Sequence, residues 1–304
     1  MRAKHLNRRQ FLGQTIASGT SVAAAMTTWS WAAQPSVGRK AKLGTPKAEK
    51  LGWRICCQMY TFRDRSFYEG LEVVTGLGVR RVEPAFFLPL SKERPDLKTG
   101  ESLPPDQRRE MKQRMADLGI TMPNYYAPIE GDKSTYRKTF DFAREMGVET
   151  LVAEPPGEMF ETLDGLCQEY KINLAVHNHP EGSGSKYWNP DTFMKACAGC
   201  SPRIGACPDT GHWVRSGLDT LASLRKYGKR IRAVHLKDAA ESGKRDSRDV
   251  PLGTGAGHFT ALLQQFYDWK WQGVMTVEYE HLSPQLIPDV AQCVKFVEAF
   301  ATNV

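Results

Sequence analysis

The sequence lacks several patterns that mark common protein classes. No Gly-x-Gly-x-x-Gly motif follows its first apolar run, so nothing indicates a dinucleotide-binding fold. Lysine and arginine do not cluster among aromatic residues, which argues against a nucleic acid as the partner. Cys197 and Cys200 form a C-x-x-C pair without a second pair to complete a zinc ribbon. A redox pair, half of a zinc site and a disulfide stay open for these two thiols.

The excess of positive charge is smaller than the total of +7 suggests. Four basic residues, Arg2, Lys4, Arg8 and Arg9, lie near the N-terminus without acidic neighbours. Without them, 37 basic residues face 34 acidic ones, which leaves a charge of +3. So small a charge suits an uncharged or mildly acidic small ligand better than a polyanion.

The N-terminal segment resembles an export signal. Residues 7–13 read Asn-Arg-Arg-Gln-Phe-Leu-Gly, which is similar to the twin-arginine motif, and an uncharged stretch rich in Ala, Ser and Thr follows to residue 33. A stretch of roughly 20 residues is long enough for a membrane span, but Gln14 and many hydroxyl groups make it too polar for one. We expect a cleaved signal over 1–33, a linker over 34–50, and a mature periplasmic or extracytoplasmic protein without a membrane anchor.

Eight short apolar runs recur roughly every 30 residues between residue 51 and the C-terminus, with amphipathic stretches between them. The predicted strands are 54–60, 79–84, 120–125, 148–154, 172–177, 204–207, 231–235 and 274–278. Helical spacing of apolar residues marks 164–170 and 258–269, and Gly78, Gly119 and Gly147 stand where helices are expected to end. Strands that alternate with helices predict a parallel sheet, and eight units predict a single-domain (β/α)₈ TIM barrel over 51–304.

Polar side chains gather where these strands end, which is the active-site end of such a barrel. Carboxylates and imidazoles together suit Mn²⁺, Fe²⁺, Co²⁺ or Zn²⁺, and no cysteine at these ends argues for a thiolate site. The residues concerned are Glu83, Glu154, His177, His179, Asp209, His212, His235, Lys237, Asp238, Glu278 and Glu280.

The chain from about Arg54 onward resembles the xylose isomerase-like barrel superfamily, which includes sugar phosphate isomerases and epimerases, inosose dehydratase and endonuclease IV. The resemblance rests on Asp-Thr-Gly-His at 209–212, Val-His-Leu-Lys-Asp at 234–238, Leu-Gly-Thr-Gly at 252–255 and Val-Glu-Tyr-Glu at 277–280. It implies one divalent metal ion bound by side chains from the last four strands.

Carried over residue by residue, the resemblance implies His177, Asp209, His235 and Glu278 as the metal ligands. The departure is at the fifth strand, where many relatives have Glu and this chain has His177, as inosose dehydratase-like members do. Either His177 coordinates the metal or Glu154 supplies the missing carboxylate, and we favour His177.

The resemblance also implies residues that contact a sugar or polyol substrate. His212 follows Asp209 by three residues, where relatives bind a substrate hydroxyl or carbonyl, and His179 lies in the same histidine-rich segment. Lys237 either contacts substrate or pairs with Asp238 or Glu280 to brace the rim, and bracing is the expectation for Asp238. Among aromatic residues in the loops, Trp213 is a further expected contact.

Glu83 has two interpretations of its own. It either contacts substrate or pairs with Arg80 or Arg81, which are close in sequence. The Gly253-Thr254-Gly255 segment is only a weak candidate for binding a phosphate group.

The expected activity is that of a sugar isomerase or epimerase. A metal ion would stabilise an enediolate, while Glu154 and Glu278 take and return a proton beside a carbonyl. The same residues would give a dehydratase or lyase if a leaving group lies β to the abstracted proton. An endonuclease IV-like hydrolase and a noncatalytic sugar-binding protein are weaker alternatives, and the resemblance also allows a homo-oligomer.

Overall fold

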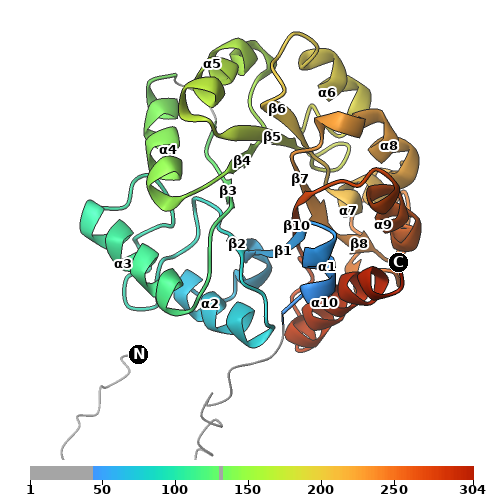
Figure 1. Cartoon of the computed structure of the whole chain (residues 1–304), viewed down its shortest axis with the longest axis horizontal. Coiled ribbons are helices and arrows are strands. Elements are labelled where there is room, and N and C mark those ends of the chain that lie inside the picture. Colours follow the sequence, from blue (N-terminus) through green and yellow to red (C-terminus); the bar gives the residue numbers. More distant parts are fainter. Residues whose placement is uncertain (1–43, 130–132) are drawn as a thin grey trace, which may run out of the picture. The chain divides into compact units, whose positions relative to one another are not determined.

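The computed structural model describes residues 44–129 and 133–304. In this part of the chain, a ring of parallel strands occupies the centre and helices enclose it (Figure 1). The predicted export signal at 1–33 lies outside the described residues. Among the described residues, no helix combines the length and the apolar character needed to cross a membrane.

The predicted strands form the barrel wall. They are β1 Trp53–Gln58, β2 Val82–Glu83, β3 Asn124–Tyr126, β4 Thr150–Ala153, β5 Asn173–His177, β6 Ile204–Cys207, β7 Ala233–Leu236 and β10 Gly273–Val277. Two further strands, β8 Asp238–Ala239 and β9 Asp249–Val250, form an antiparallel hairpin after β7 that the sequence did not predict.

The wall closes on itself through parallel pairing. One segment has the order β2-β1-β10-β7 and the other β3-β4-β5-β6. The parallel bridge between Arg81 and Thr121 joins β2 to β3, and that between Asp209 and His235 joins β6 to β7. Both seams are therefore paired, and the prediction of a single (β/α)₈ barrel is confirmed.

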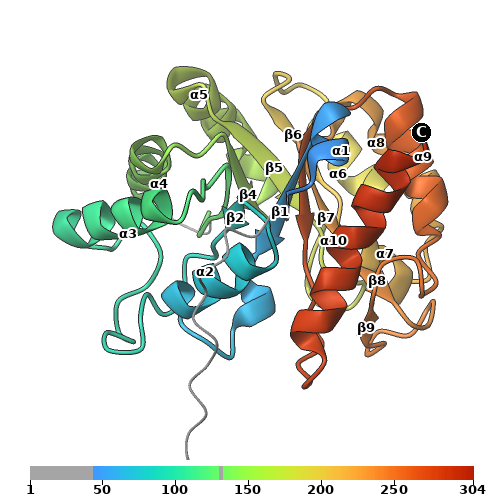
Figure 2. The same cartoon turned by 60° about the horizontal axis from the view of Figure 1, so that its bottom comes forward.

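Eight helices cover the outside of the described barrel, one after each wall strand (Figure 2). They are α2 Phe67–Gly76, α3 Pro105–Asp117, α4 Lys133–Met146, α5 Phe160–Tyr170, α6 Pro190–Ala196, α8 Thr220–Tyr227, α9 Phe259–Asp268 and α10 Leu286–Thr302. The short helix α7 Thr210–Arg215 follows β6 directly.

The helices form where apolar residues repeat at helical spacing. In α9, the residues at positions 259, 262, 263 and 266 are all buried against the strands. Gly78, Gly119 and Gly147 have φ values of +75°, +65° and +79° after α2, α3 and α4, as expected for glycines that end a helix. These glycines let the chain turn directly into the next strand.

The inside of the barrel differs from the layer between strands and helices. Val152, Ala175, Cys207 and Ala233 form a separate, small cluster of buried side chains. These short side chains fill the inner wall on strands β4 to β7. The polar residues lie beyond them, at the carboxyl ends of the strands.

The barrel begins earlier than the predicted boundary at residue 51. Helix α1 Pro46–Lys50 buries Ala48, and the backbone N–H groups of Lys47 and Ala48 donate to the Glu298 carboxylate on α10. The last residues of the predicted linker over 34–50 are therefore part of the packed domain.

Cys197 and Cys200 are both free thiols.

Candidate active site

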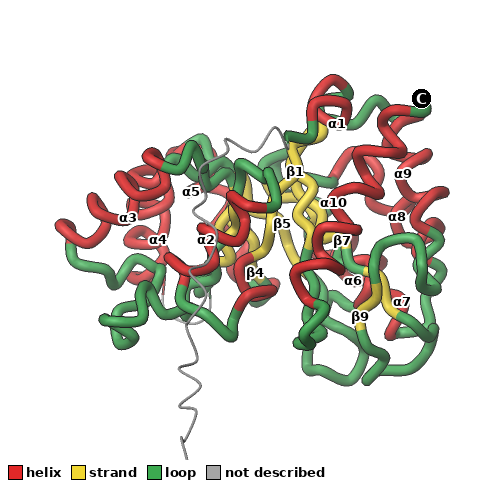
Figure 3. Tube along the Cα trace, turned by 90° about the horizontal axis from the view of Figure 1, so that it is seen from below, coloured by secondary structure: helices red, strands yellow, loops and turns green. Residues whose placement is uncertain are grey.

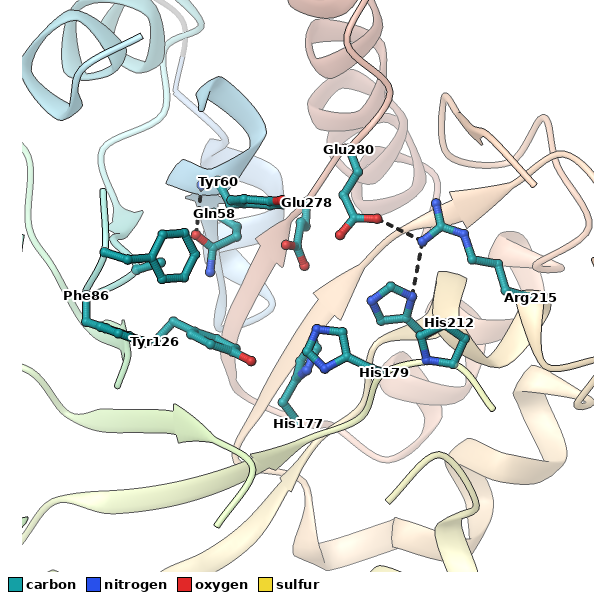
Figure 4. Close-up of a pocket in the computed structure, with 13 residues that line it drawn as sticks. Gln58, Tyr60, Phe86, Tyr126, His177, His179, His212, Arg215, Glu278 and Glu280 are labelled. Carbon is teal, nitrogen blue, oxygen red and sulfur yellow. Dashed lines mark hydrogen bonds and ion pairs between the residues drawn. The ribbon is translucent and has the colours of Figure 1, made fainter. Parts of the chain in front are cut away.

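A cavity of about 570 Å³ opens at the carboxyl ends of the strands. Long loops gather at this end of the barrel in Figure 3. Figure 4 shows histidines on one side of the cavity and aromatic rings on the other. Its lining residues are Gln58, Tyr60, Ala85, Phe86, Phe87, Tyr126, His177, His179, Pro180, His212, Arg215, Glu278 and Glu280.

Four buried side chains from neighbouring strands meet at the base of this cavity. His177 ends β5, Asp209 follows β6, His235 lies in β7 and Glu278 follows β10, and one ligand atom of each lies within 4.8 Å of the others. Strand pairing explains the convergence, because His235 is bridged to Asp209 on one side and paired with Thr276 of β10 on the other.

The facing atoms of this ligand set are His177 Nε2, Asp209 Oδ2, His235 Nδ1 and Glu278 Oε2. All four are buried, and the two carboxylate oxygens have Lys237 Nζ as their cationic neighbour, at 3.0 and 3.2 Å. Four buried ligand atoms that point at one place, two of them ring nitrogens, fit a cation held between them. Two imidazoles and two carboxylates are the donors that Mn²⁺, Fe²⁺, Co²⁺ and Zn²⁺ accept.

Each histidine of the set is oriented by a carboxylate behind it. His235 Nε2 lies 2.7 Å from Glu83 Oε1, and His177 Nδ1 lies 3.3 Å from Glu154 Oε1. A proton on each of these nitrogens leaves the other nitrogen as a lone pair that faces the ligand set. His235 Nδ1 lies 2.9 Å from Glu278 Oε2, a contact that a shared cation would hold together and that a second proton on His235 would turn into an ion pair.

Asp209 has two functions in the local structure. Its Oδ1 accepts the His212 backbone N–H at 2.9 Å, which caps α7, while its Oδ2 faces the ligand set. The Asn178 side chain accepts from the Asp209 backbone N–H at 2.9 Å and donates to its carbonyl at 3.2 Å. The backbone of this residue is therefore fixed from both sides.

Lys237 supplies a buried positive charge beside the ligand set. Its Nζ lies 3.0 Å from Asp209 Oδ2, 3.2 Å from Glu278 Oε2 and 3.1 Å from Glu280 Oε1. Burial alone would raise the pKa of Glu278, but Lys237 and His235 outweigh it and hold this pKa at about 2. Both carboxylates of the set are thus ionised and able to bind a cation at neutral pH.

His179 is the histidine of this group that is most open to the cavity, with 42% of its side chain exposed. Its Nδ1 contacts Glu154 Oε1, and Ser185 Oγ donates to Glu154 Oε2 at 2.6 Å. Burial would raise the pKa of Glu154, but its bonds with His177 and His179 outweigh that effect and lower it. The Nε2 of His179 has no hydrogen-bond partner among the described residues and is available to a ligand.

His212 lies beside His179, with ring centroids 5.1 Å apart. Arg215 Nη1 lies 3.1 Å from His212 Nδ1, and a guanidinium can only donate. The His212 Nδ1 therefore accepts, while its Nε2 faces the Lys237 ammonium, with Nζ at 3.3 Å. Burial, reinforced by Lys237, lowers the pKa of His212 to about 3.

The opposite side of the cavity is apolar. Tyr60, Phe86 and Tyr126 lie along it in Figure 4, and the rings of Phe86 and Phe87 meet edge to face at 5.1 Å. Phe87 is 41% exposed at the rim. Aromatic faces opposite polar groups suit a sugar, which has an apolar and a hydroxylated side.

A model of the xylose isomerase-like TIM barrel family matches residues 71–297. The chain belongs to this family. Inosose dehydratase from Geobacillus thermodenitrificans is 25% identical over 175 residues, which cover 47% of this chain and 58% of that protein. The chain spans about half the length of the curated relatives that it matches.

Solved structures share the barrel of this family. An uncharacterized protein from Parabacteroides distasonis is 26% identical with a TM-score of 0.64, and the match covers 81% of this chain and 98% of that one. A xylose isomerase-like TIM barrel protein from Mycobacterium smegmatis, solved in complex with magnesium, is 15% identical with a TM-score of 0.65, over 83% and 97% of the two chains.

Some residues expected to contact substrate or to move protons in this family site are placed elsewhere. Trp213 is fully buried and packs on Tyr227 with ring centroids 5.4 Å apart, and it does not line the cavity. Glu83 is also fully buried and pairs with neither Arg80 nor Arg81. Its carboxylate oxygens instead contact His235 and other buried side chains. Glu154 does not line the cavity and lies behind the histidines.

Lys237 and Asp238 both contact protein groups at the rim. Lys237 pairs with Glu280 rather than with Asp238. Asp238 accepts the backbone N–H groups of Gly253, Gly255 and Gly257 at 3.0, 3.0 and 2.9 Å. These N–H groups are therefore unavailable to a phosphate group, which removes the weak phosphate candidate in this loop.

The sequence interpretation missed Arg215 and Asp249. Arg215 contacts His212, Glu280 and Asp249, with 2.8 Å to Glu280 Oε2 and 2.5 Å to Asp249 Oδ1. Its position three residues after His212 in a helix was a signal that could have found it. Asp249 lies in the unpredicted hairpin, and no signal pointed to it.

Proposed function

We propose that the protein is a metal-dependent carbon–oxygen lyase that eliminates water or an alcohol from a keto-sugar or keto-polyol. The observation that supports this proposal most directly is the position of His179. Its imidazole lines the cavity, its Nδ1 contacts Glu154, and its Nε2 is free. One base on one side of a substrate can take a proton from carbon and pass it to a neighbouring atom.

The ligand set would hold the metal ion through His177, Asp209, His235 and Glu278. When bound, a divalent ion supplies Lewis acidity to substrate oxygens. The family structure that contains magnesium is consistent with a cation here, although the metal of this chain is Mn²⁺, Fe²⁺, Co²⁺ or Zn²⁺ in our proposal. His177 rather than Glu154 is the proposed fourth ligand.

The chain's own residues would divide the work of elimination. His179 Nε2 takes the proton from the carbon beside the carbonyl, and Glu154 stabilises the imidazolium that forms. The positive charge of Lys237, beside the ligand set, would stabilise the negative charge that develops on the carbonyl oxygen. The bond from the β carbon to oxygen then breaks, and His179 returns its proton to the departing oxygen.

Isomerisation between adjacent carbons is the second candidate, because the same imidazole can return the proton to a neighbouring carbon. Epimerisation needs a base on each face of the substrate. The second carboxylate expected for that role, Glu154, lies behind His177 and His179. The relatives named inosose dehydratase add weight to elimination.

The reaction in D₂O tests whether the protein eliminates an oxygen substituent from its substrate. We expect the Mn²⁺-loaded protein in D₂O to convert an inosose or a 3-keto-glycoside with loss of water or the aglycone, and His179→Gln to lose the activity about 100-fold or more. His258→Asn is the matched control, because His258 is exposed and has φ +53°, which Asn tolerates. Interconversion of free ketoses without loss of an oxygen substituent would favour the isomerase instead.

Export by the twin-arginine route also stays a proposal. It rests on the N-terminal motif at residues 7–13. Replacing Arg8 and Arg9 by lysine in the full chain is expected to retain the protein in the cytoplasm, as cell fractionation would measure. Unchanged export of this variant would overturn the proposal.

A further inference from the structure

A second pocket of about 430 Å³ adjoins the candidate active site. The two share Tyr60, Arg215 and Glu280 as lining residues, so they are continuous at this rim. The second pocket lies beneath the loop of the β8–β9 hairpin, which contributes four consecutive residues from 245 to 248. Nothing in the proposed elimination uses this pocket.

The carboxylates of this pocket are mostly neutralised from within. Asp249 Oδ1 lies 2.5 Å from Arg215 Nη2, and Glu280 Oε2 lies 2.8 Å from Arg215 Nη1. Glu280 Oε1 also lies 3.1 Å from Lys237 Nζ. These two acidic groups therefore do not attract further cations to the pocket.

Three more arginines line the same pocket, Arg63, Arg245 and Arg248. None of the three has an ion-pair partner among the described residues, and Asp246 is the remaining carboxylate of the lining. Three positive charges thus face one negative charge. A pocket with this excess attracts an anion.

Arg63 is held in place without being neutralised. Its Nη2 donates to the Glu280 carbonyl at 2.6 Å and its Nη1 to the Tyr60 carbonyl at 3.3 Å, and the guanidinium stands 4.5 Å from the centre of the Tyr60 ring. Carbonyl oxygens carry no net charge, so the guanidinium keeps its own. Its remaining N–H groups are available to a ligand.

The pocket is within reach of a substrate bound at the ligand set. Lys237 Nζ contacts both Glu280 Oε1, at 3.1 Å, and Glu278 Oε2, at 3.2 Å. Glu280 and Lys237 thus connect the Arg63 side of the rim to the ligand set. A sugar ring over the ligand set would extend an exocyclic group toward the arginines.

We propose that this pocket binds an anionic substituent of the substrate, a carboxylate or a phosphate group, through Arg63, Arg245 and Arg248. The substrate would then be a sugar acid or a sugar phosphate, which narrows the class given above and rests on the proposed function. Planar guanidinium groups bind both kinds of oxyanion through paired N–H donors.

Binding measurements on the Zn²⁺-loaded protein test this pocket by titration calorimetry at low ionic strength. The probes are D-glucuronate, D-glucose 6-phosphate and D-glucose, and the double variant Arg245→Gln/Arg248→Gln removes two exposed charges. We expect at least one anionic sugar to bind tenfold or more tightly than glucose, and the double variant to lose this advantage. The stronger of the two anionic probes identifies carboxylate or phosphate as the preferred group.

Arg109→Gln is the control, because Arg109 is an exposed arginine on α3 at a distance from the pocket. Equal binding of all three sugars, or an advantage that persists in the double variant, would overturn the proposal. Inorganic sulfate separates it from the proposed function, because the pocket should bind sulfate in Glu278→Gln as well. If sulfate binding disappears with Glu278→Gln, the anion binds at the metal ion, and the proposal that the second pocket binds an anion is also overturned.

Discussion

Glu83→Gln should weaken metal binding while leaving the fold intact. Glu83 Oε1 accepts from His235 Nε2 at 2.7 Å and from Gln58 Nε2 at 2.9 Å, while Oε2 accepts from Asn124 Nδ2 and Thr276 Oγ1, both at 3.1 Å. A glutamine can keep its amide oxygen on the His235 side. The substitution then removes the charge that makes His235 a strong ligand.

The NH₂ group that Glu83→Gln introduces in place of Oε2 can also find hydrogen-bond acceptors. Asn124 Oδ1 has no hydrogen-bond partner, so a flip of the Asn124 amide would present this oxygen to the new NH₂ group. The Thr276 hydroxyl can accept as well as donate. The cost to the free energy of unfolding should therefore stay within about 1.5 kcal/mol, the value of one hydrogen bond.

Metal affinity should fall much more than stability. Loss of a residue that orients a metal-binding histidine typically lowers affinity about 10- to 100-fold, which is about 1.4 to 2.7 kcal/mol. Competition with a chromophoric zinc chelator measures the affinity, and urea unfolding of the metal-free protein measures the fold. Glu72→Gln, which removes an exposed carboxylate on α2 without an ion-pair partner among the described residues, is the control. A change of less than about threefold in a folded Glu83→Gln protein would refute the argument.

Three further substitutions test the supports of the site and the barrel. Gly211→Ala would bring a Cβ to 2.5 Å from Lys237 Cγ, so urea unfolding should show a loss of about 1–3 kcal/mol. Asp238→Ala leaves the N–H groups of loop 253–257 without their acceptor, and hydrogen exchange should become faster in this loop than in α9. Arg54→Ala breaks a half-exposed ion pair and should cost less than about 1 kcal/mol by the same unfolding assay.

The barrel could be predicted because its signals are local. Apolar runs and glycines at helix ends fix the order of strands and helices without any knowledge of tertiary contacts. The bounds of β2 and β3 were less accurate, since the predicted runs 79–84 and 120–125 became two short strands. Pro84 and Pro123 adjoin these strands and have no N–H to donate, which shortens the ladder there.

The position of the site could be predicted, but the direction of single side chains could not. Strand ends meet at one edge of a barrel, so His177, Asp209 and His235 were expected to be neighbours. The partner of His235 is Glu83, which is 152 residues away in sequence, and only the closed barrel brings the two together. Local sequence therefore suggested nearby arginines as partners of Glu83 in place of the histidine.

The balance of buried charge gives a further reason for a divalent ion at the ligand set. Arg215 and Lys237 face Asp249 and Glu280, which leaves the charges of Asp209 and Glu278 to be balanced. Lys237 lies within 3.2 Å of both remaining carboxylates, but a single ammonium cannot neutralise two of them as well as Glu280. An ion of charge two between the imidazoles would offset the charges of Asp209 and Glu278 and free Lys237 for Glu280, while the Glu83 and Glu154 carboxylates contact the far nitrogens of His235 and His177.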